Sequence, residues 1–130
     1  MNEPIWIEKY EALTLHNRLL ALDGGAGGVR DEGLLESALA RPRHLFAYGD
    51  DPSIIDMAAA YMTGIVRNHP FVDGKKRTGF VVGVLFLELN GYRFRASESE
   101  ATQAVLDLAA GQIDDAALGR WIAANASRNA

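Results

Sequence analysis

The feature that most limits how this chain can fold is a short polar loop followed at once by an apolar run. Residues 68–78 are rich in charged and polar side chains, whereas the run Gly79–Leu87 contains none. Pro70 and Gly74 disfavour regular structure in the polar part, which predicts a loop there. The stretch 78–89 has no turn signal and is longer than most strands, so we predict a helix that is buried on nearly all sides.

The junction between this loop and the predicted helix is suited to binding an anion. Backbone N–H groups at the start of a helix have no partner within the helix, and the helix dipole adds partial positive charge. We expect the N–H groups of Gly74, Lys75 and Lys76 to point outward at this junction. The side chains of Lys76 and Arg77 are predicted to bind phosphate, as a point charge and as a planar fork respectively.

Two further side chains of the loop favour phosphate chemistry. Asp73 could hold a magnesium ion through one carboxylate, with water and phosphate oxygens filling the remaining positions. His69 carries an imidazole, the side chain best suited to general base catalysis near neutral pH. His16 and His44 lack comparable neighbours in the sequence, and we predict structural roles for both. The loop is therefore predicted to form a phosphate-handling active site.

The remainder of the chain predicts an all-α fold of about six helices, wrapped around the helix at 78–89. Other helices are expected over residues 5–22, from Asp31 to a stop at Pro42, from Pro52 to Asn68, from the Ser97–Glu100 capping box to Gly111, and from Asp114 onward. Phe71 is expected to pin the loop to the core. The glycine-rich segment 24–28 is predicted to be a flexible loop, and residues 44–49 a connector.

Composition limits the classes of function that the chain can have. A chain of 130 residues is expected to form a single domain spanning 1–130. Its net charge of −4 argues against direct binding of nucleic acid. The amino terminus has no signal-peptide pattern, cysteine is absent, and the longest apolar run is far shorter than the roughly 20 residues that span a bilayer. We therefore expect a cytoplasmic protein without a membrane or nucleic-acid partner.

The loop also carries a family resemblance. It resembles the signature of the Fic/Doc (Fido) family, and in particular of the death-on-curing (Doc) branch, at His69, Phe71, Asp73, Gly74, Lys76, Arg77 and Thr78. The segment from Gly24 to Pro42 looks like the amino-terminal half of the same branch, so the resemblance covers roughly residues 10–125. It implies the all-α Fido fold. Lys75 departs from the pattern, because the family has an asparagine at this position.

The resemblance implies a Doc-type toxin of a bacterial toxin–antitoxin system. Such a toxin transfers phosphate from ATP to a Ser or Thr hydroxyl of a target protein, here expected to be a translation elongation factor. In the implied roles, His69 takes the proton of the hydroxyl and Asp73 holds Mg²⁺. The phosphates of ATP are bound by Arg67, Gly74, Lys75, Lys76 and Arg77.

Two alternatives remain open. Nucleotidyl transfer (AMPylation) is the chemistry that the Fic branch implies, although Lys76 stands where Fic enzymes have a glycine and seat the inner phosphates. A catalytically weakened or inactive binding module is the other alternative, because Lys75 replaces the family's asparagine. Lysine can only donate hydrogen bonds and has a flexible stem, whereas phosphoryl transfer depends on accurate positioning.

The resemblance also implies how the protein is regulated. Fic enzymes are restrained by an inhibitory helix with the pattern Ser/Thr-x-x-x-Glu followed by Gly or Asn, and this chain has no such string. We therefore expect inhibition in trans by a small antitoxin. Its carboxy-terminal segment is expected to fold into a groove near Arg77 and the glycine-rich segment 24–28.

Overall fold

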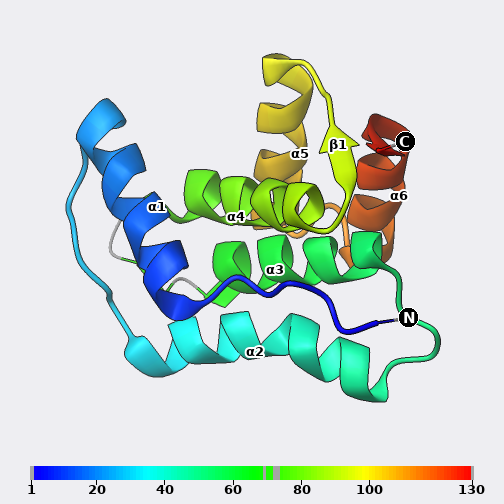
Figure 1. The fold of residues 1–130 in the computed structure, drawn as a ribbon. Helices are drawn as coiled ribbons and strands as arrows, with labels where there is room; N and C mark the ends of the chain where they lie inside the picture. The colour runs from blue at the N-terminus through cyan, green and yellow to red at the C-terminus, as the bar shows by residue number, and fades with distance from the viewer. Residues whose placement is uncertain (1, 69, 72–73, 130) are drawn as a thin grey trace.

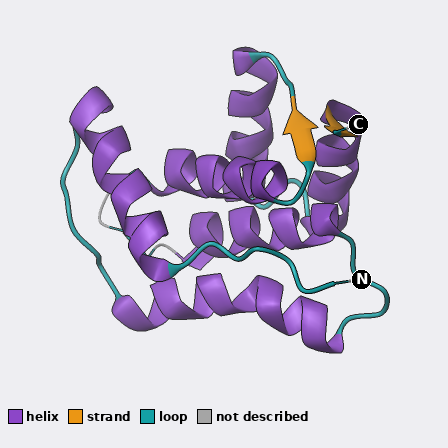
Figure 2. Cartoon of the chain, in the orientation of Figure 1, coloured by secondary structure: helices purple, strands orange, loops and turns teal. Residues whose placement is uncertain are grey.

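The computed structural model describes residues 2–68, 70–71 and 74–129. Within these residues six helices dominate, accompanied by one small antiparallel sheet, as Figure 2 shows. The prediction of an all-α fold with about six helices is confirmed. In chain order the elements are α1 (Lys9–Asp23), α2 (Glu32–Tyr48), α3 (Ile54–Asn68), α4 (Lys75–Leu89), β1 (Tyr92–Phe94), α5 (Glu98–Ala109), α6 (Asp115–Asn125) and β2 (Ala126–Arg128).

Helix α3 forms the centre of the fold. Every residue from Met57 to Val66 is buried, and Figure 1 shows α3 lying between α2 and α4. The predicted centre was the helix now labelled α4, but this helix buries one face and exposes Lys76, Arg77 and Glu88. The middle of α4 is equally free of charge, but other elements cover it less completely, so that Phe80, Val81, Val84 and Leu85 are only partly buried. Despite this apolar character, none of the helices in the described ranges is long and apolar enough to cross a membrane.

Two glycines let α4 approach α3 closely. A Cβ atom on Gly79 would lie 2.9 Å from Val66, and one on Gly83 would lie 2.5 Å from Met62. Separations this short are not tolerated between carbon atoms. The backbone of α4 can therefore approach α3 this closely only because Gly79 and Gly83 have no side chain. A larger residue at either position would push the two helices apart.

Helix α2 ends later than predicted. It continues through Pro42 to Tyr48, so neither the stop at Pro42 nor the connector at 44–49 is observed. Proline removes one backbone hydrogen bond from a helix. Here the burial of Pro42 and the packing of Leu45 and Phe46 against the core offset that loss.

The helix starts predicted from capping residues agree with the structure. The N-caps predicted at Asp31, Ser97 and Asp114 are confirmed, since each side chain accepts a hydrogen bond from a backbone N–H three residues later. Gly91, with φ of 90°, has the left-handed conformation that glycine commonly adopts after the end of a helix. Helix α4 itself begins at Lys75, three residues before the predicted start.

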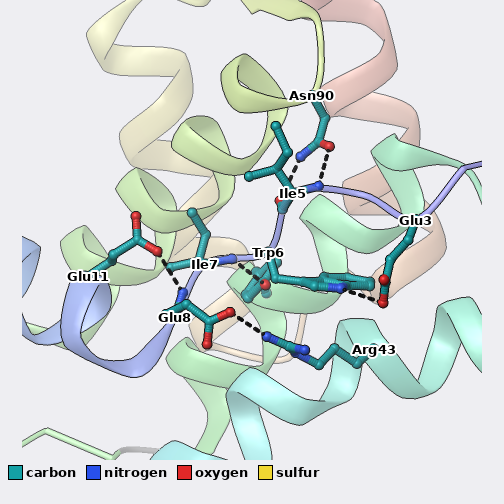
Figure 3. Close-up of polar contacts among 9 residues, drawn as sticks. Glu3, Ile5, Trp6, Ile7, Glu8, Glu11, Arg43 and Asn90 are labelled. Carbon is teal, nitrogen blue, oxygen red and sulfur yellow. Dashed lines mark hydrogen bonds and ion pairs between the residues drawn. The ribbon is translucent and has the colours of Figure 1, made fainter.

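Residues 5–8, predicted to be helical, instead form an extended segment that ties α1 to the core (Figure 3). The side-chain amide of Asn90 accepts from the N–H of Ile5 at 2.8 Å and donates to its carbonyl at 2.9 Å. The buried hydroxyl of Tyr61 accepts from the N–H of Ile7 at 3.0 Å. Partners elsewhere in the fold therefore satisfy the backbone groups that a helix would have paired internally.

Replacing the buried tyrosine should destabilise the fold. Tyr61→Phe is expected to lower the free energy of unfolding by about 1–3 kcal/mol, because the buried N–H of Ile7 loses its acceptor. Equilibrium urea unfolding at pH 7 measures the difference. Tyr10→Phe is the matched control, since Tyr10 is 70% exposed, and it should leave stability unchanged. Equal stability of the two variants would contradict the role given to this bond.

Tyr61 should also make the free energy of unfolding fall with rising pH in the alkaline range. Burial raises the pKa of Tyr61 from its ordinary value of 10.0 to about 12. Because the folded state disfavours the phenolate, the stabilising contribution is complete below about pH 10 and is lost as the pH rises towards 12. The stability difference between the wild type and Tyr61→Phe should therefore shrink by roughly 1.4 kcal/mol per pH unit across this interval. Urea unfolding at several pH values would show it, and a constant difference would contradict it.

Candidate active site

The candidate site lies where α3 ends and α4 begins. Helix α3 ends at Asn68, as predicted, and Gly74 is the N-cap of α4. Gly74 has φ of 78°, in the left-handed region that glycine adopts without strain. Because glycine has no side chain, the N-cap of α4 places no side-chain acceptor on the first N–H groups of the helix. This arrangement is the one by which helix starts bind anions.

The start of the loop is held by a segment far away in the sequence. The N–H groups of Arg30 and Asp31 both donate to the carbonyl of Pro70, at 2.7 and 3.2 Å. The guanidinium of Arg30 donates to the carbonyl of Asn68 at 3.2 Å, and the Asn68 amide donates to the carbonyl of Leu34 in α2 at 3.1 Å. The segment that follows the glycine-rich loop is therefore fastened directly to the residues on either side of His69.

Phe71 anchors the loop to the body of the protein, as predicted. It is 2% exposed, forms an antiparallel bridge with Val29, and stacks on His16 of α1 with ring centroids 3.9 Å apart. Helix α1 also covers the end of the loop, because a Cβ atom on Gly74 would lie 3.3 Å from Leu20 and 3.5 Å from His16. Figure 1 shows α1 passing beside the start of α4. The described residues at both ends of the loop are thus in contact with one helix.

A groove opens beside the start of α4. It has a volume of about 930 Å³ and lies between α4, α5 and the chain around β1. Lys76 and Arg77 line it from the first turn of α4, and Arg95 and Glu98 line it from the opposite wall. Much of the remaining lining is apolar and includes Phe80, Val84, Phe94, Val105 and Leu106. The groove therefore combines cationic groups with apolar walls.

Arg67 lies in the last turn of α3, and its guanidinium reaches the carboxyl end of α5. It donates to the carbonyl of Leu108 at 3.4 Å and to that of Ile113 at 2.7 Å. These bonds connect α3 to the turn between α5 and α6. The structure gives Arg67 a structural role, and its contact with phosphate stays a prediction.

The other predicted site residues divide into two groups. Lys76 and Arg77 are exposed and share the groove, as phosphate-binding residues require. His69 and Asp73, the predicted base and magnesium ligand, lie outside the described residues. The backbone of Lys75 begins α4, but its side chain also lies outside the description. Among the side chains that are described, no cluster of three His, Cys, Asp or Glu could hold a metal ion, so the magnesium site rests on Asp73 as a prediction.

Two residues that hold the loop, Arg30 and Asn68, were not singled out from the sequence, and the structural role predicted for His16 did not include its contact with the loop. A signal for His16 was present, because it lies one helical turn from Ala12 and one from Leu20, on a largely apolar face of the predicted helix. Arg30 lay within the segment that resembles the family, but its bond to Asn68 joins residues 38 apart. Spacing in the sequence carries no signal for such a contact.

Comparison with known proteins agrees with this geometry. The model of the Fic/DOC family matches residues 6–87, a range that contains the loop and the start of α4. The chain is 45% identical over 75 residues to "Toxin Doc" of Mycolicibacterium smegmatis, covering 56% of this chain and 57% of that protein. It is 32% identical over 85 residues to "Protein kinase doc" of Escherichia phage P1, covering 65% of this chain and 68% of that protein.

The family match covers more than half of the chain, and the chain belongs to the Fic/Doc family. Its similarity to two Doc proteins supports the Doc branch, as the loop signature predicted. The matched stretch spans little more than half the length of the mycobacterial relative.

The hydrogen bonds of Arg67 can be tested separately from any catalytic role. Arg67→Ala is expected to lower the free energy of unfolding by about 1 kcal/mol, because α3 loses its two bonds to the α5–α6 turn. Lys76→Ala removes an exposed cation of the groove and serves as the control, with a change within about 0.5 kcal/mol. Urea unfolding measures both. If the two variants were equally stable, the bonds of Arg67 would contribute nothing to the fold.

Proposed function

We propose that this chain is a Doc-type toxin, which transfers phosphate from ATP to a Ser or Thr hydroxyl of a target protein. The observation that carries the proposal is the start of α4, where a glycine N-cap is followed by Lys76 and Arg77 at the side of a groove. Phosphoryl transfer depends on positioning and on neutralising negative charge. Backbone donors and two cations at one helix start meet both needs. The relative named "Protein kinase doc" supports phosphate as the transferred group.

Each residue of the loop has a distinct role in this proposal. His69 accepts the proton of the target hydroxyl, which makes the oxygen a better nucleophile. Arg77 binds phosphate oxygens through paired N–H groups, and Lys76 binds them as a compact positive charge. Asp73 holds Mg²⁺, which helps to neutralise the charge of the phosphates when it is bound. The backbone of Gly74 to Lys76 supplies further donors.

The proposal includes a small antitoxin that inhibits the toxin in trans. One relative is named a toxin, which supports this pairing. The groove beside Arg77 also supports it, because apolar walls suit one face of an amphipathic helix. Arg77 and Arg95 would pair with acidic residues at the edge of that helix. The toxin would act in the bacterial cytoplasm, with a translation elongation factor as its target.

Intact-mass spectrometry tests the proposed reaction. A purified bacterial translation elongation factor, incubated with the chain, ATP and Mg²⁺, is expected to gain the mass of one phosphoryl group. A gain of AMP would instead indicate nucleotidyl transfer, the Fic chemistry. If neither this factor nor any protein of a bacterial extract changed in mass, the chain would be a binding module without catalysis.

Replacing His69 separates chemistry from binding. His69→Ala is expected to slow phosphate transfer by about a hundredfold or more, because the general base is lost. The affinity for ATP, measured by calorimetry, should persist because the groups that bind phosphate remain. An equal loss of binding and transfer would mean that His69 is structural.

Lys75→Asn tests the one position that departs from the family signature. If an asparagine amide orients a phosphate oxygen only in the transition state, this variant should transfer phosphate faster, by about one to two decades in rate. The affinity for ATP should stay equal or fall, because a positive charge beside the phosphates is lost. Growth inhibition and the transfer rate give the comparison. An unchanged rate with a fully active wild type would show that lysine is a working substitute.

A further inference from the structure

A buried histidine lies against the loop, and the proposed chemistry does not use it. His16 is in the middle of α1 and is 1% exposed. Its ring lies nearly parallel to that of Phe71, with centroids 3.9 Å apart and planes inclined by 10°. Phe71 belongs to the loop between α3 and α4, two positions beyond His69. The face of the imidazole is therefore in direct contact with the loop that carries the proposed base.

The edge of the same ring faces the other end of the loop, at Gly74. The Nε2 and Cδ2 atoms of His16 would be 3.5 and 3.6 Å from a Cβ atom built on Gly74. Gly74 is the N-cap of α4, and its carbonyl accepts the first hydrogen bond of the helix, from the N–H of Thr78. The placement of Gly74 thus sets the direction of the first N–H groups of α4. One imidazole therefore stacks on Phe71 with its face and borders, with its edge, the space that a side chain at Gly74 would occupy.

A histidine is an unusual residue for the buried position 16. Burying an imidazole costs free energy unless its polar atoms are hydrogen-bonded. A phenylalanine would provide a flat ring for stacking on Phe71 without that cost. The buried histidine therefore indicates a use for the polar edge, and this edge borders Gly74.

We propose that His16 is a positioning residue of the site. Its ring fixes the placement of Phe71 relative to Gly74, and thereby orients both the loop that carries His69 and the phosphate-binding start of α4. The consequence for the transfer rate rests on the proposed function, whereas the placement of the loop can be measured without it.

The test compares His16→Phe with His44→Phe. The first keeps a flat ring on Phe71 and removes the polar edge, and the second makes the same change at an exposed position of α2. His16→Phe is expected to be as stable to urea as the wild type or more so. It should nevertheless transfer phosphate about tenfold more slowly, because a small misplacement of catalytic groups is costly in rate. His44→Phe should match the wild type in both measurements.

Amide hydrogen exchange supplies a readout that needs no activity. The N–H group of Thr78, which donates to the carbonyl of Gly74, should exchange about tenfold faster in His16→Phe, as expected for local loosening, while the rest of α4 is unchanged. His16→Gln places an amide near the position of Nε2 and should keep the exchange rate of Thr78 closer to that of the wild type. It also serves as the informative variant if His16→Phe does not fold.

The outcomes separate the two proposals. Faster exchange together with slower transfer supports the positioning role. Faster exchange in a protein whose wild type transfers no phosphate supports the role of His16 and overturns the proposed function. Wild-type exchange at Thr78, or wild-type transfer despite faster exchange, would overturn the proposal and leave His16 as a packing residue.

Discussion

The close contact between α3 and α4 is the constraint on which the candidate site depends. Helix α3 is buried from Met57 to Val66, and α4 reaches it through Gly79 and Gly83 without intervening side chains. The loop leaves one of these helices at Asn68 and enters the other after Gly74. The backbone of α4 packs directly against side chains of α3. Both ends of the loop are therefore fixed by the core. A site built this way is placed by burial and needs no disulfide or metal to hold its ends.

A second layer of contacts shapes the loop between those fixed ends. Helix α1 is tied to α3 through the hydrogen bond from Ile7 to the buried hydroxyl of Tyr61, and it covers the loop through His16. The segment after the glycine-rich loop adds the paired bonds from Arg30 and its neighbour to the carbonyl of Pro70. Segments far apart in the sequence therefore converge on a loop whose cationic end borders the groove. Preorganisation of this kind is what phosphoryl transfer requires of a protein.

The sequence predicted those features that neighbouring residues determine alone. The N-caps at Asp31, Ser97 and Asp114 and the cations beside the start of α4 are contiguous signals, and the structure confirms them. Pro42 shows where local rules fail, because packing of the last turns of α2 outweighs one missing hydrogen bond. The bonds of Arg67 to the α5–α6 turn and the burial of His16 against Phe71 depend on how helices are arranged in space. The sheet of β1 and β2 was not predicted, because strands of three residues are too short to show an alternation of apolar and polar residues.

Titration of the backbone amide chemical shifts with ATP and Mg²⁺ tests most directly whether phosphate binds at the start of α4. The largest changes are expected at Gly74 and at residues 75–77, with smaller changes in the segment around Arg30. Helix α6 and the sheet of β1 and β2 should change little. Saturable changes centred on another part of the chain, or no saturable change at all, would contradict a phosphate-binding site at this helix start.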